Sequence, residues 1–425
     1  MKYNESSANA HWQTLKLREL GDFSRGLSKH RPRNDVALFS GGGYPLIQTG
    51  EIREANLYVT SHHVEYGEFG LRQSKLWDAD TLCITIAANI AETAILSYPM
   101  CFPDSVVGFI ADKKLTSELF VYYVFEYIRM AIKNAASGSA QDNINIEYLT
   151  SLEFKIPNKA VQDSIVGVLA SLDRMILLNN QVNDNLQAMA LSQFMHQFFR
   201  KDPNGELSDV LIELPKSQVQ VRDAKDIAGR YPFFTSGASV LRWDEPLAGG
   251  RNLLLNTGGN ADVKFYVGDM AYSTDTWAIT ARDGLADYTY LLLQAISPEL
   301  DQKYFLGTGL RHLQKPLLKK RPIYIPSVSE LRAFNAVVVP AMTMISENLR
   351  ENRQLQELRD WLLPMLMNGQ ATVASSDKLS FCVDRTTIHP ADNAQRKEQF
   401  DAMLYLLTES PCINLRGACA PPVAG

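Results

Sequence analysis

The chain has 425 residues, of which 46% are hydrophobic, 21% charged and 9% aromatic, a composition typical of a globular protein rather than a disordered one. This length predicts two to four domains. The 42 basic and 47 acidic residues give a net charge of −5, which by itself argues mildly against nucleic acid as a partner.

The first part of the chain, Trp12 to Pro157, alternates in a mostly strand-like way. A helix is predicted at Ser117 to Ala136, followed by a glycine-containing loop. The stretch from Lys16 to Arg33 holds six basic residues against only Glu19 and Asp22. It could grip phosphates or form an ordinary solvated face, and the sequence leaves both readings open.

A long helix is predicted from Ile156 to Phe199, beginning after Ile156-Pro157 and ending near the helix-breaking cluster 201–205. Its seam positions step by four and three residues, as in a coiled coil. One of them is polar, and the set is Val161, Ile165, Val168, Leu172, Met175, Asn179, Val182, Leu186 and Met189. At 1.5 Å per residue such a helix is roughly 60 Å long.

The second part of the chain repeats this order, with strands, a short helix predicted at Asp287 to Ile296, and a second basic stretch from Arg311 to Arg321 that holds no acid. A shift of 169 residues superimposes the two copies of the helix without a gap. It places Gly138 on Gly307, Ile156-Pro157 on Ile325-Pro326, Leu186 on Leu355, and Asn179 and Asn183 on Asn348 and Asn352.

The second long helix, Ser327 to Asn368, keeps the seam, although Pro340 is expected to kink it and Pro364 to end or bend it. Its seam positions are Phe334, Val337, Ala341, Met344, Asn348, Glu351, Leu355, Leu358 and Leu362. Because each helix needs a partner for its seam, we expect the two to pair antiparallel about a pseudo-twofold axis. Asn179 and Asn348 would then fix the register; the alternative is that they face solvent where the seam drifts.

The predicted fold is therefore α+β: two strand-rich domains separated by two long antiparallel coiled-coil helices in an internal pseudo-twofold repeat. The expected boundaries are a first domain at 1–157, a helix at 158–200, a second domain at 201–326, a helix at 327–369 and a tail of uncertain role at 370–425. One helix, Asn393 to Leu407, is predicted in the tail.

Common catalytic motifs are missing from the sequence, including a P-loop, G-x-S-x-G, H-E-x-x-H and any S-adenosylmethionine motif. Pro103-Asp104 followed by Asp112-Lys113-Lys114 resembles a nuclease magnesium set, but one strand separates the acids, so a nuclease is disfavoured. The five cysteines form no metal-ligand pattern, and no apolar run suits a signal peptide or a bilayer. We expect no catalytic residue, metal, cofactor or membrane partner, and a cytoplasmic location.

The residues quoted for the repeat also carry a resemblance to a known family. GYPLIQTGEI, GSAQDNINIEYLTSLEFKIPNKAVQDSIVGVLASLDRMILLNNQ, GRYPFFTSG and GLRHLQKPLLKKRPIYIPSVSELRAF, in this order, resemble the specificity subunit of type I restriction–modification systems, from about Trp12 to Gln370. The two Ile-Pro helix entries and their spacing are the strongest part of the likeness. The tail beyond Gln370 departs from the family pattern.

The resemblance implies a non-catalytic DNA-binding subunit with two target-recognition domains, each reading half of a bipartite, asymmetric double-stranded DNA target. The helices would act as a ruler and as docking surfaces for adenine methyltransferase modification subunits and for the restriction subunit. The alternative is a non-catalytic coiled-coil adaptor whose domains bind proteins. The bases that are read and the spacing of the half-sites are not predicted.

Candidate DNA contacts follow from the side chains that suit bases and phosphates, which are Arg, Lys, Asn, Gln and short polar groups. In the first domain they are Gln48, Thr49, Arg53, Arg72, Lys75 and Asn89. In the second they are Thr235, Ser236, Arg242, Arg251, Asn256, Asn260 and Lys264. The equivalent loops 138–143 and 307–312 are further candidates, and an ordinary surface role stays open for each residue.

Overall fold

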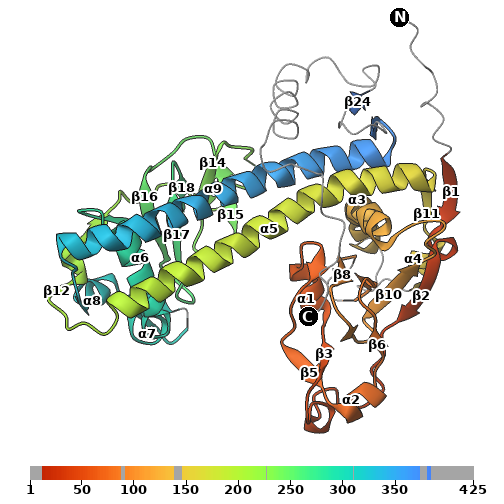
Figure 1. Cartoon of the computed structure of the whole chain (residues 1–425), viewed down its shortest axis with the longest axis horizontal. Helices are drawn as coiled ribbons and strands as arrows, with labels where there is room; N and C mark the ends of the chain where they lie inside the picture. Colours follow the sequence, from red (N-terminus) through yellow and green to blue (C-terminus); the bar gives the residue numbers. More distant parts are fainter. Residues whose placement is uncertain are drawn as a thin grey trace, which may run out of the picture. The chain divides into compact units, whose positions relative to one another are not determined.

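A computed structural model describes residues 12–87, 91–137, 146–225, 227–309, 311–373 and 381–383. The chain forms two compact units: unit 1 combines Met1–Leu177 with Gln354–Gly425, and unit 2 is Leu178–Arg353. Two long helices, yellow α5 (Lys159–Gln197) and blue α9 (Val328–Met367), each contribute one part to each unit (Figure 1). The helix predicted in the tail lies outside the described residues.

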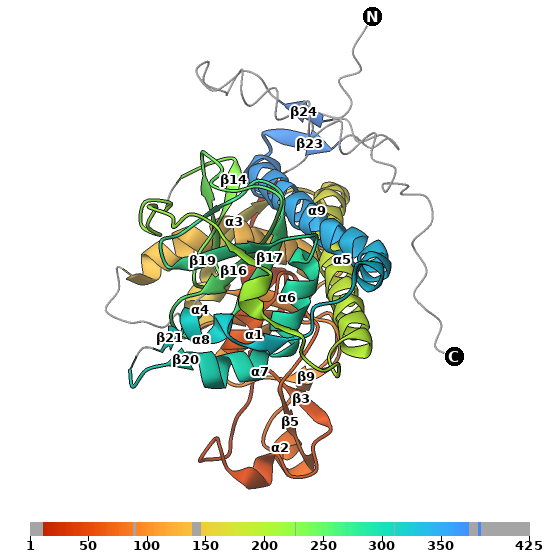
Figure 2. The same cartoon turned by 90° about the vertical axis from the view of Figure 1, so that its left-hand side faces the viewer.

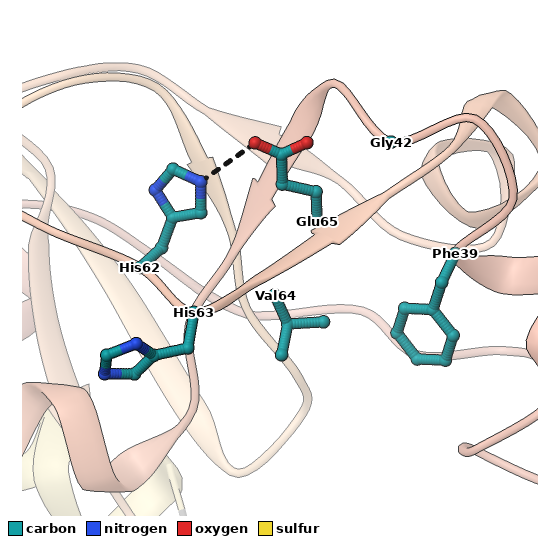
Figure 3. A pocket seen from close by; sticks show the side chains of 6 residues that line it. All are labelled: Phe39, Gly42, His62, His63, Val64 and Glu65. Atoms are coloured by element: carbon teal, nitrogen blue, oxygen red, sulfur yellow. Dashed lines mark hydrogen bonds and ion pairs between the residues drawn. The ribbon is translucent and has the colours of Figure 1, made fainter. Parts of the chain in front are cut away.

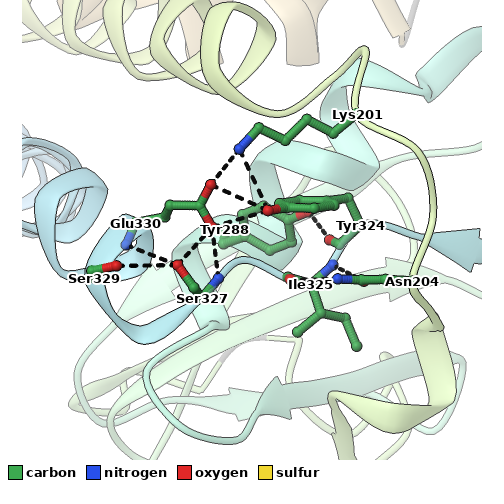
Figure 4. Close-up of polar contacts among 8 residues, drawn as sticks. All are labelled: Lys201, Asn204, Tyr288, Tyr324, Ile325, Ser327, Ser329 and Glu330. Atoms are coloured by element: carbon green, nitrogen blue, oxygen red, sulfur yellow. Dashed lines mark hydrogen bonds and ion pairs between the residues drawn. The ribbon is translucent and has the colours of Figure 1, made fainter.

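Local signals in the sequence set where both long helices begin. Asn158 caps α5 by accepting a hydrogen bond from the Val161 N–H at 3.1 Å. Ser327 and Glu330 form a capping box at the start of α9, where the Glu330 carboxylate accepts from the Ser327 N–H at 2.8 Å. Figure 4 shows Lys201 and Tyr324 gathered around the same carboxylate. The Lys201 ammonium and the Ser327 donors lower the pKa of Glu330 to about 2.

The helix α9 runs through Pro340 and Pro364 and ends at Met367, one turn after the second proline. Gly369 follows in the left-handed region with φ 75°, a conformation that glycine tolerates best. Pro364 therefore does not itself end the helix, because a proline lacks only its own N–H and the last turn still forms, with the Asn368 N–H donating to the Pro364 carbonyl at 3.1 Å.

Unit 1 is built from mostly antiparallel sheets and short helices. A five-stranded sheet has the order β2 (Gly21–Arg25), β10 (Val106–Ala111), β7 (Leu82–Thr85), β8 (Thr93–Leu96), β4 (Tyr58–Val59). A four-stranded sheet has the order β5 (Val64–Tyr66), β3 (Tyr44–Leu46), β9 (Met100–Cys101), β6 (Leu76–Trp77). The remaining elements are β1 (Gln13–Lys16) paired with β11 (Glu153–Ile156), β23 (Ala371–Val373) paired with β24 (Phe381–Val383), and the helices η1 (Leu17–Glu19), η2 (Val36–Leu38), α1 (Thr49–Glu54), α2 (Glu68–Arg72), α3 (Glu118–Ser137) and α4 (Ile146–Ser151).

Unit 2 also joins small sheets to short helices (Figure 2). Its main sheets have the orders β13 (Leu211–Glu213), β19 (Thr276–Ala281), β16 (Arg251–Asn256), β17 (Val263–Val267), and β15 (Val240–Trp243), β14 (Tyr231–Phe234), β18 (Ala271–Tyr272). The rest are β12 (Gly205–Glu206) with β22 (Pro322–Ile323), β20 (Phe305–Leu306) with β21 (His312–Leu313), and the helices η3 (Leu207–Asp209), α6 (Ala286–Ala295), α7 (Ser297–Glu299), η4 (Leu300–Tyr304) and α8 (Lys315–Lys319). The short helix predicted from the sequence is α6.

In unit 1 the two long helices bury the predicted seam. Ile165, Val168 and Leu172 of α5 belong to the same buried core as Leu355 and Leu362 of α9. This core also contains the apolar side chains of α3 and of the five-stranded sheet, so the helices are anchored to the strand-rich part of their own unit.

In unit 2 the predicted seam is buried only in part. Val182, Met189, Val337 and Met344 are 40 to 47% exposed. The buried side chains include Asn183, Ala190 and Phe194 of α5 and Phe198 just after it. In α9 they include the predicted seam positions Phe334 and Ala341 together with Val338 and Met342. A straight helix has 3.6 residues per turn, so a strict 3.5-residue pattern drifts around it, and the faces that are buried here pack on the domain of unit 2.

Asparagines join the two helices within unit 2. Asn179 donates to Asn352 at 2.9 Å and to Glu351 at 3.0 Å, while Asn348 donates to Asn183 at 2.7 Å. Later residues of α5 meet earlier residues of α9, so the helices run antiparallel there. The prediction that Asn179 faces the other helix rather than solvent is confirmed; its role in setting the register stays a prediction.

One helix of the described residues, α9, is long and apolar enough by length and composition to cross a membrane. Polar contacts tie the same helix to strands of unit 2: Ser346 accepts from the Val267 N–H at 3.0 Å, and Thr343 accepts from Arg251 at 2.8 Å. Such contacts are those of a helix packed on its own domain, since a membrane span has no strands of this kind beside it.

Candidate nucleic-acid interface

Unit 2 gathers five of its seven predicted contact residues at one edge of its sheets. Thr235 follows β14, Asn256 ends β16 and Lys264 lies in β17. The Lys264 ammonium donates to the Asn256 side-chain oxygen at 3.3 Å and to the Thr235 carbonyl at 3.5 Å. The Lys264 ammonium therefore brings together three positions that are distant in sequence and that come from two different sheets.

Ser236 and Asn260 complete this surface. Ser236 donates to the Asp275 carbonyl, and Asn256 donates to the Asn260 carbonyl at 3.3 Å. Asn260 is exposed, whereas Asn256 and Thr235 are buried. The Asn260 side chain can therefore reach a ligand directly. The Asn256 side chain instead stabilises the turn that contains Asn260.

The loop predicted at 307–312 meets this edge through Arg311. The Arg311 guanidinium donates to both carboxylate oxygens of Asp301, at 2.8 and 3.1 Å, and to the Asn260 Oδ1 at 2.7 Å. The Arg311 guanidinium, followed by the Ala261 N–H, lowers the pKa of the Asp301 carboxyl below its ordinary value. The turn and the loop are further joined by the Gly259 N–H, which donates to the Arg311 carbonyl at 2.9 Å.

Arg242 and Arg251 lie elsewhere in unit 2. Arg251 forms a bidentate ion pair with Asp287, a side chain that is only 1% exposed, and also donates to Thr343 of α9. Arg242 donates to the Gly229 carbonyl at 2.8 Å. The contacts of Arg251 are structural, since they hold β16 and α6 against α9.

The second basic stretch is largely paired within unit 2. Besides Arg311, Lys319 forms an ion pair with Glu213, and Arg321 with Glu299 at 2.9 Å. Hydrogen bonds from Lys319 and Trp277 lower the pKa of Glu213 despite its partial burial. Basic residues of this stretch therefore form ion pairs with acidic residues from other parts of unit 2. This pairing makes a phosphate-binding role for the stretch less well supported.

In unit 1 the predicted contacts fall in two places. Gln48, Thr49 and Arg53 belong to α1, where Gln48 caps the helix and its N–H donates to Glu51 at 3.1 Å. Gln48 and Arg53 are exposed, and Arg53 lies 3.6 Å from Glu54. The helix thus presents both side chains outward.

Arg72 and Lys75 form the second place in unit 1. Arg72 ends α2, and the Lys75 ammonium lies 3.5 Å from the centre of the buried Trp77 ring. The first basic stretch runs alongside, because the Lys29 N–H donates to the Gln73 carbonyl at 3.0 Å. Lys29 is exposed and was not among the predicted contacts, although it lies in the predicted basic stretch.

Asn89 and the loop 138–143 lie outside the described residues. For every other predicted contact the structure gives a position, and each role in binding DNA stays a prediction.

The acids considered for a nuclease lie apart. Asp104 pairs with Arg33 at 2.7 Å, and Asp112 lies at the other end of β10, a strand of six residues and so about 20 Å long. Among the described residues, no group of three or more His, Cys, Asp or Glu side chains could hold a metal ion. The geometry gives the nuclease reading no support.

A pocket in unit 1 contains the His62-His63 pair (Figure 3). His62 contacts Glu65 at 3.1 Å and the Tyr98 hydroxyl at 2.6 Å. The Gly43 N–H and then His62 lower the pKa of Glu65. These contacts hold the loop before β5 in place, and no nucleophile lines the pocket.

Two strand-rich units that share two long helices place the chain among α+β proteins, a fold class that does not by itself define a function. Residues 9–188 match the family model of the type I restriction modification DNA specificity domain. The chain is 21% identical over 410 residues to the MjaIX type I restriction enzyme specificity subunit of Methanocaldococcus jannaschii, covering 85% of this chain and 94% of the relative.

Further relatives agree with this match. The HindI specificity subunit of Haemophilus influenzae is 30% identical over 108 residues, 25% of this chain and 23% of that one. A crystal structure of a type I restriction–modification S subunit from M. genitalium superposes with a TM-score of 0.54 at 16% identity, covering 86% of this chain and 98% of that one. The chain is thus similar to type I restriction–modification specificity subunits over most of its length, in agreement with the resemblance found in the sequence.

Proposed function

We propose that the chain is a sequence-specific DNA-binding subunit that recognises a bipartite, asymmetric target and is itself non-catalytic. The observation that carries this proposal is the gathering of Thr235, Ser236, Asn256, Asn260 and Lys264 at one edge of unit 2. Ser236, Asn260 and Lys264 are not buried, and side chains of these types suit base edges and phosphates. Unit 1 offers a different set, Gln48 with Arg53 and Arg72 with Lys75, so the two halves of the target differ.

The long helices set the distance between the half-sites in this proposal. At 1.5 Å per residue, the 39 residues of α5 make a helix about 58 Å long. We infer an antiparallel coiled coil with pseudo-twofold symmetry. The inference is supported by two hydrogen bonds, Asn179 to Asn352 and Asn348 to Asn183, which exchange under the 169-residue shift of the repeat.

The same helices carry the proposed docking surface for the modification subunits. Val182 and Met189 lie seven residues apart on one face of α5, and Val337 and Met344 do the same on α9. All four side chains are 40 to 47% exposed in unit 2. Exposed apolar side chains that recur along a helix suit a protein partner. Adenine methyltransferase modification subunits and a restriction subunit are the proposed partners, with no cofactor bound by this chain and a cytoplasmic location.

Selection from a library of randomised duplexes, with the chain assembled with its modification subunits, tests this function. We expect enrichment of two short half-sites separated by an unspecified gap, and binding that weakens steeply with salt. Binding without any sequence preference would contradict the proposal.

A further inference from the structure

Asn260 has the most restricted geometry of the exposed predicted contacts. Its Oδ1 accepts a hydrogen bond from Arg311 at 2.7 Å. A guanidinium has only donors, so the atom that faces it must be the amide oxygen and not the amide nitrogen. The side chain therefore cannot flip without losing this bond.

Arg311 is itself fixed by Asp301. Two hydrogen bonds of 2.8 and 3.1 Å join the guanidinium to the carboxylate, and a third reaches the Asp301 carbonyl at 3.3 Å. Asp301 in turn accepts from the Ala261 N–H at 2.9 Å, beside Asn260 in the chain. The planar fork of arginine is rigid, so this bidentate pair holds the oxygen of Asn260 in one direction.

The other end of the amide is available to a ligand. Asn260 is exposed, and its Nδ2 amino group makes no hydrogen bond to the described part of the chain. Each base pair presents its own set of donors and acceptors in the major groove: guanine accepts at O6 and N7, thymine at O4 and adenine at N7, whereas cytosine only donates, from N4. An outward amino group suits the accepting edges.

We propose that Asn260 is a base-reading residue that offers a fixed hydrogen-bond donor, and that Arg311 is a positioning residue that sets the direction of this amide. The target base pair then presents an acceptor to Asn260, and cytosine is disfavoured at that place. This inference rests on the proposed function, and it gives Arg311 a role other than gripping phosphate.

The test repeats the selection from randomised duplexes with variants of the full chain in the assembled complex. Asn260→Asp keeps the shape and exchanges the outward donor for an acceptor. We expect the preference at one base pair of one half-site to move toward cytosine or adenine, which donate, by about fivefold, the size of one hydrogen bond. Asn260→Ala is expected to erase the preference at the same base pair.

Arg311→Lys tests the positioning role. A lysine cannot bridge Asp301 and Asn260 in a fixed plane, so the amide becomes free to flip and the preference at that same base pair is expected to relax by about fivefold. Arg321→Lys is the matched control, because Arg321 forms an ion pair of similar length with Glu299 in the same unit, and it should leave every base preference unchanged.

Three outcomes would overturn the inference. A uniform loss of affinity across all sequences in Asn260→Ala would show a phosphate contact, and an unchanged profile would show no contact. Arg311→Lys with an unaltered preference at the Asn260 base pair would remove the positioning role. A wild-type complex without sequence preference would instead refute the proposed function, so the two failures are distinguishable.

Discussion

The same two helices are buried in different ways in the two units. In unit 1 the predicted seam of Ile165, Leu172 and Leu355 is buried, and a buried ion pair joins Asp173 to Arg359 at 2.7 Å. In unit 2 the predicted seam is half exposed, and aromatic side chains such as Phe194 and Phe334 attach the helices to their domain. The packing of the repeat is thus repeated only in part: Ile165 and its equivalent Phe334 are both buried, whereas Val168 is buried and its equivalent Val337 is 43% exposed.

The polar contacts differ as well. In unit 1 Tyr123 of α3 donates to the second oxygen of Asp173 at 2.6 Å, so one carboxylate joins α3, α5 and α9. The positions that the 169-residue shift makes equivalent to Asp173 and Arg359 are Met342 and Ala190, both buried and apolar. The ion pair is therefore particular to unit 1, whereas other positions equivalent under the shift are buried in both units, such as Leu169 with Val338 and Leu172 with Ala341.

The largest expected effect is at this ion pair. Asp173→Ala leaves Arg359 and the Tyr123 hydroxyl without their carboxylate, at a place where the Asp173 side chain is 3% exposed. We expect a loss of about 3–5 kcal/mol in the free energy of unfolding of unit 1, measured by denaturant titration. Asp360→Ala is the control, because Asp360 contacts the same guanidinium from the surface and should cost about 0.5 kcal/mol or less. Equal losses of unfolding free energy for the two substitutions would show that burial of the carboxylate does not determine the loss.

Two seam positions, one in each unit, sharpen the comparison. Leu172 is fully buried and Val182 is 41% exposed, although both fit the same heptad pattern. Leu172→Ala should destabilise by about 2–5 kcal/mol and Val182→Ala by about 0.5 kcal/mol or less, as thermal unfolding would show. If Val182→Ala destabilised as much, the seam would continue through unit 2.

If the exposed face of α5 is the docking surface, Val182→Asp should release the modification subunits while the chain keeps its stability.

The asparagine contacts should have the smallest effect on stability and a specific effect on register. Asn183→Leu leaves the amide of Asn348 without its 2.7 Å partner and should cost about 1–3 kcal/mol. Asn348→Leu in the same chain should recover at least half of this loss, because two apolar groups then face each other. A role for these residues in register would be contradicted if the double variant is stable and still prefers a single spacing between the two half-sites.

Much of the fold follows from local signals in the sequence. Pro157 and the Ser327–Glu330 box mark where the helices begin, and Gly369 marks the end of the second. The antiparallel pairing was predicted from the repeat, and the contacts of Asn179 with Asn352 and of Asn348 with Asn183 agree with it. The burial of Asn183 and the exposure of Val182 could not be predicted, since they depend on which side the domain covers.

The candidate site was predictable only in part. Residue type pointed to Asn256, Asn260 and Lys264, and the pairing of β16 with β17 brings them together. Selection by residue type also picked Arg251, but the guanidinium of Arg251 is held by the buried Asp287. Such pairing joins residues 36 positions apart and leaves no trace in composition or spacing. Arg311 was predicted only as part of a basic stretch and of the loop 307–312, and its partner Asp301 could not be predicted because it lies ten residues upstream, beyond the acid-free range.

The most direct test of the central claim is the DNA sequence that the assembled complex methylates. Reconstitution with the modification subunits and S-adenosylmethionine, followed by mapping of methylated adenines along genomic DNA, reads both half-sites at once. The two-domain account predicts one motif with two different short half-sites and a fixed unspecified gap. A contiguous or palindromic motif, or methylation without sequence preference, would contradict it.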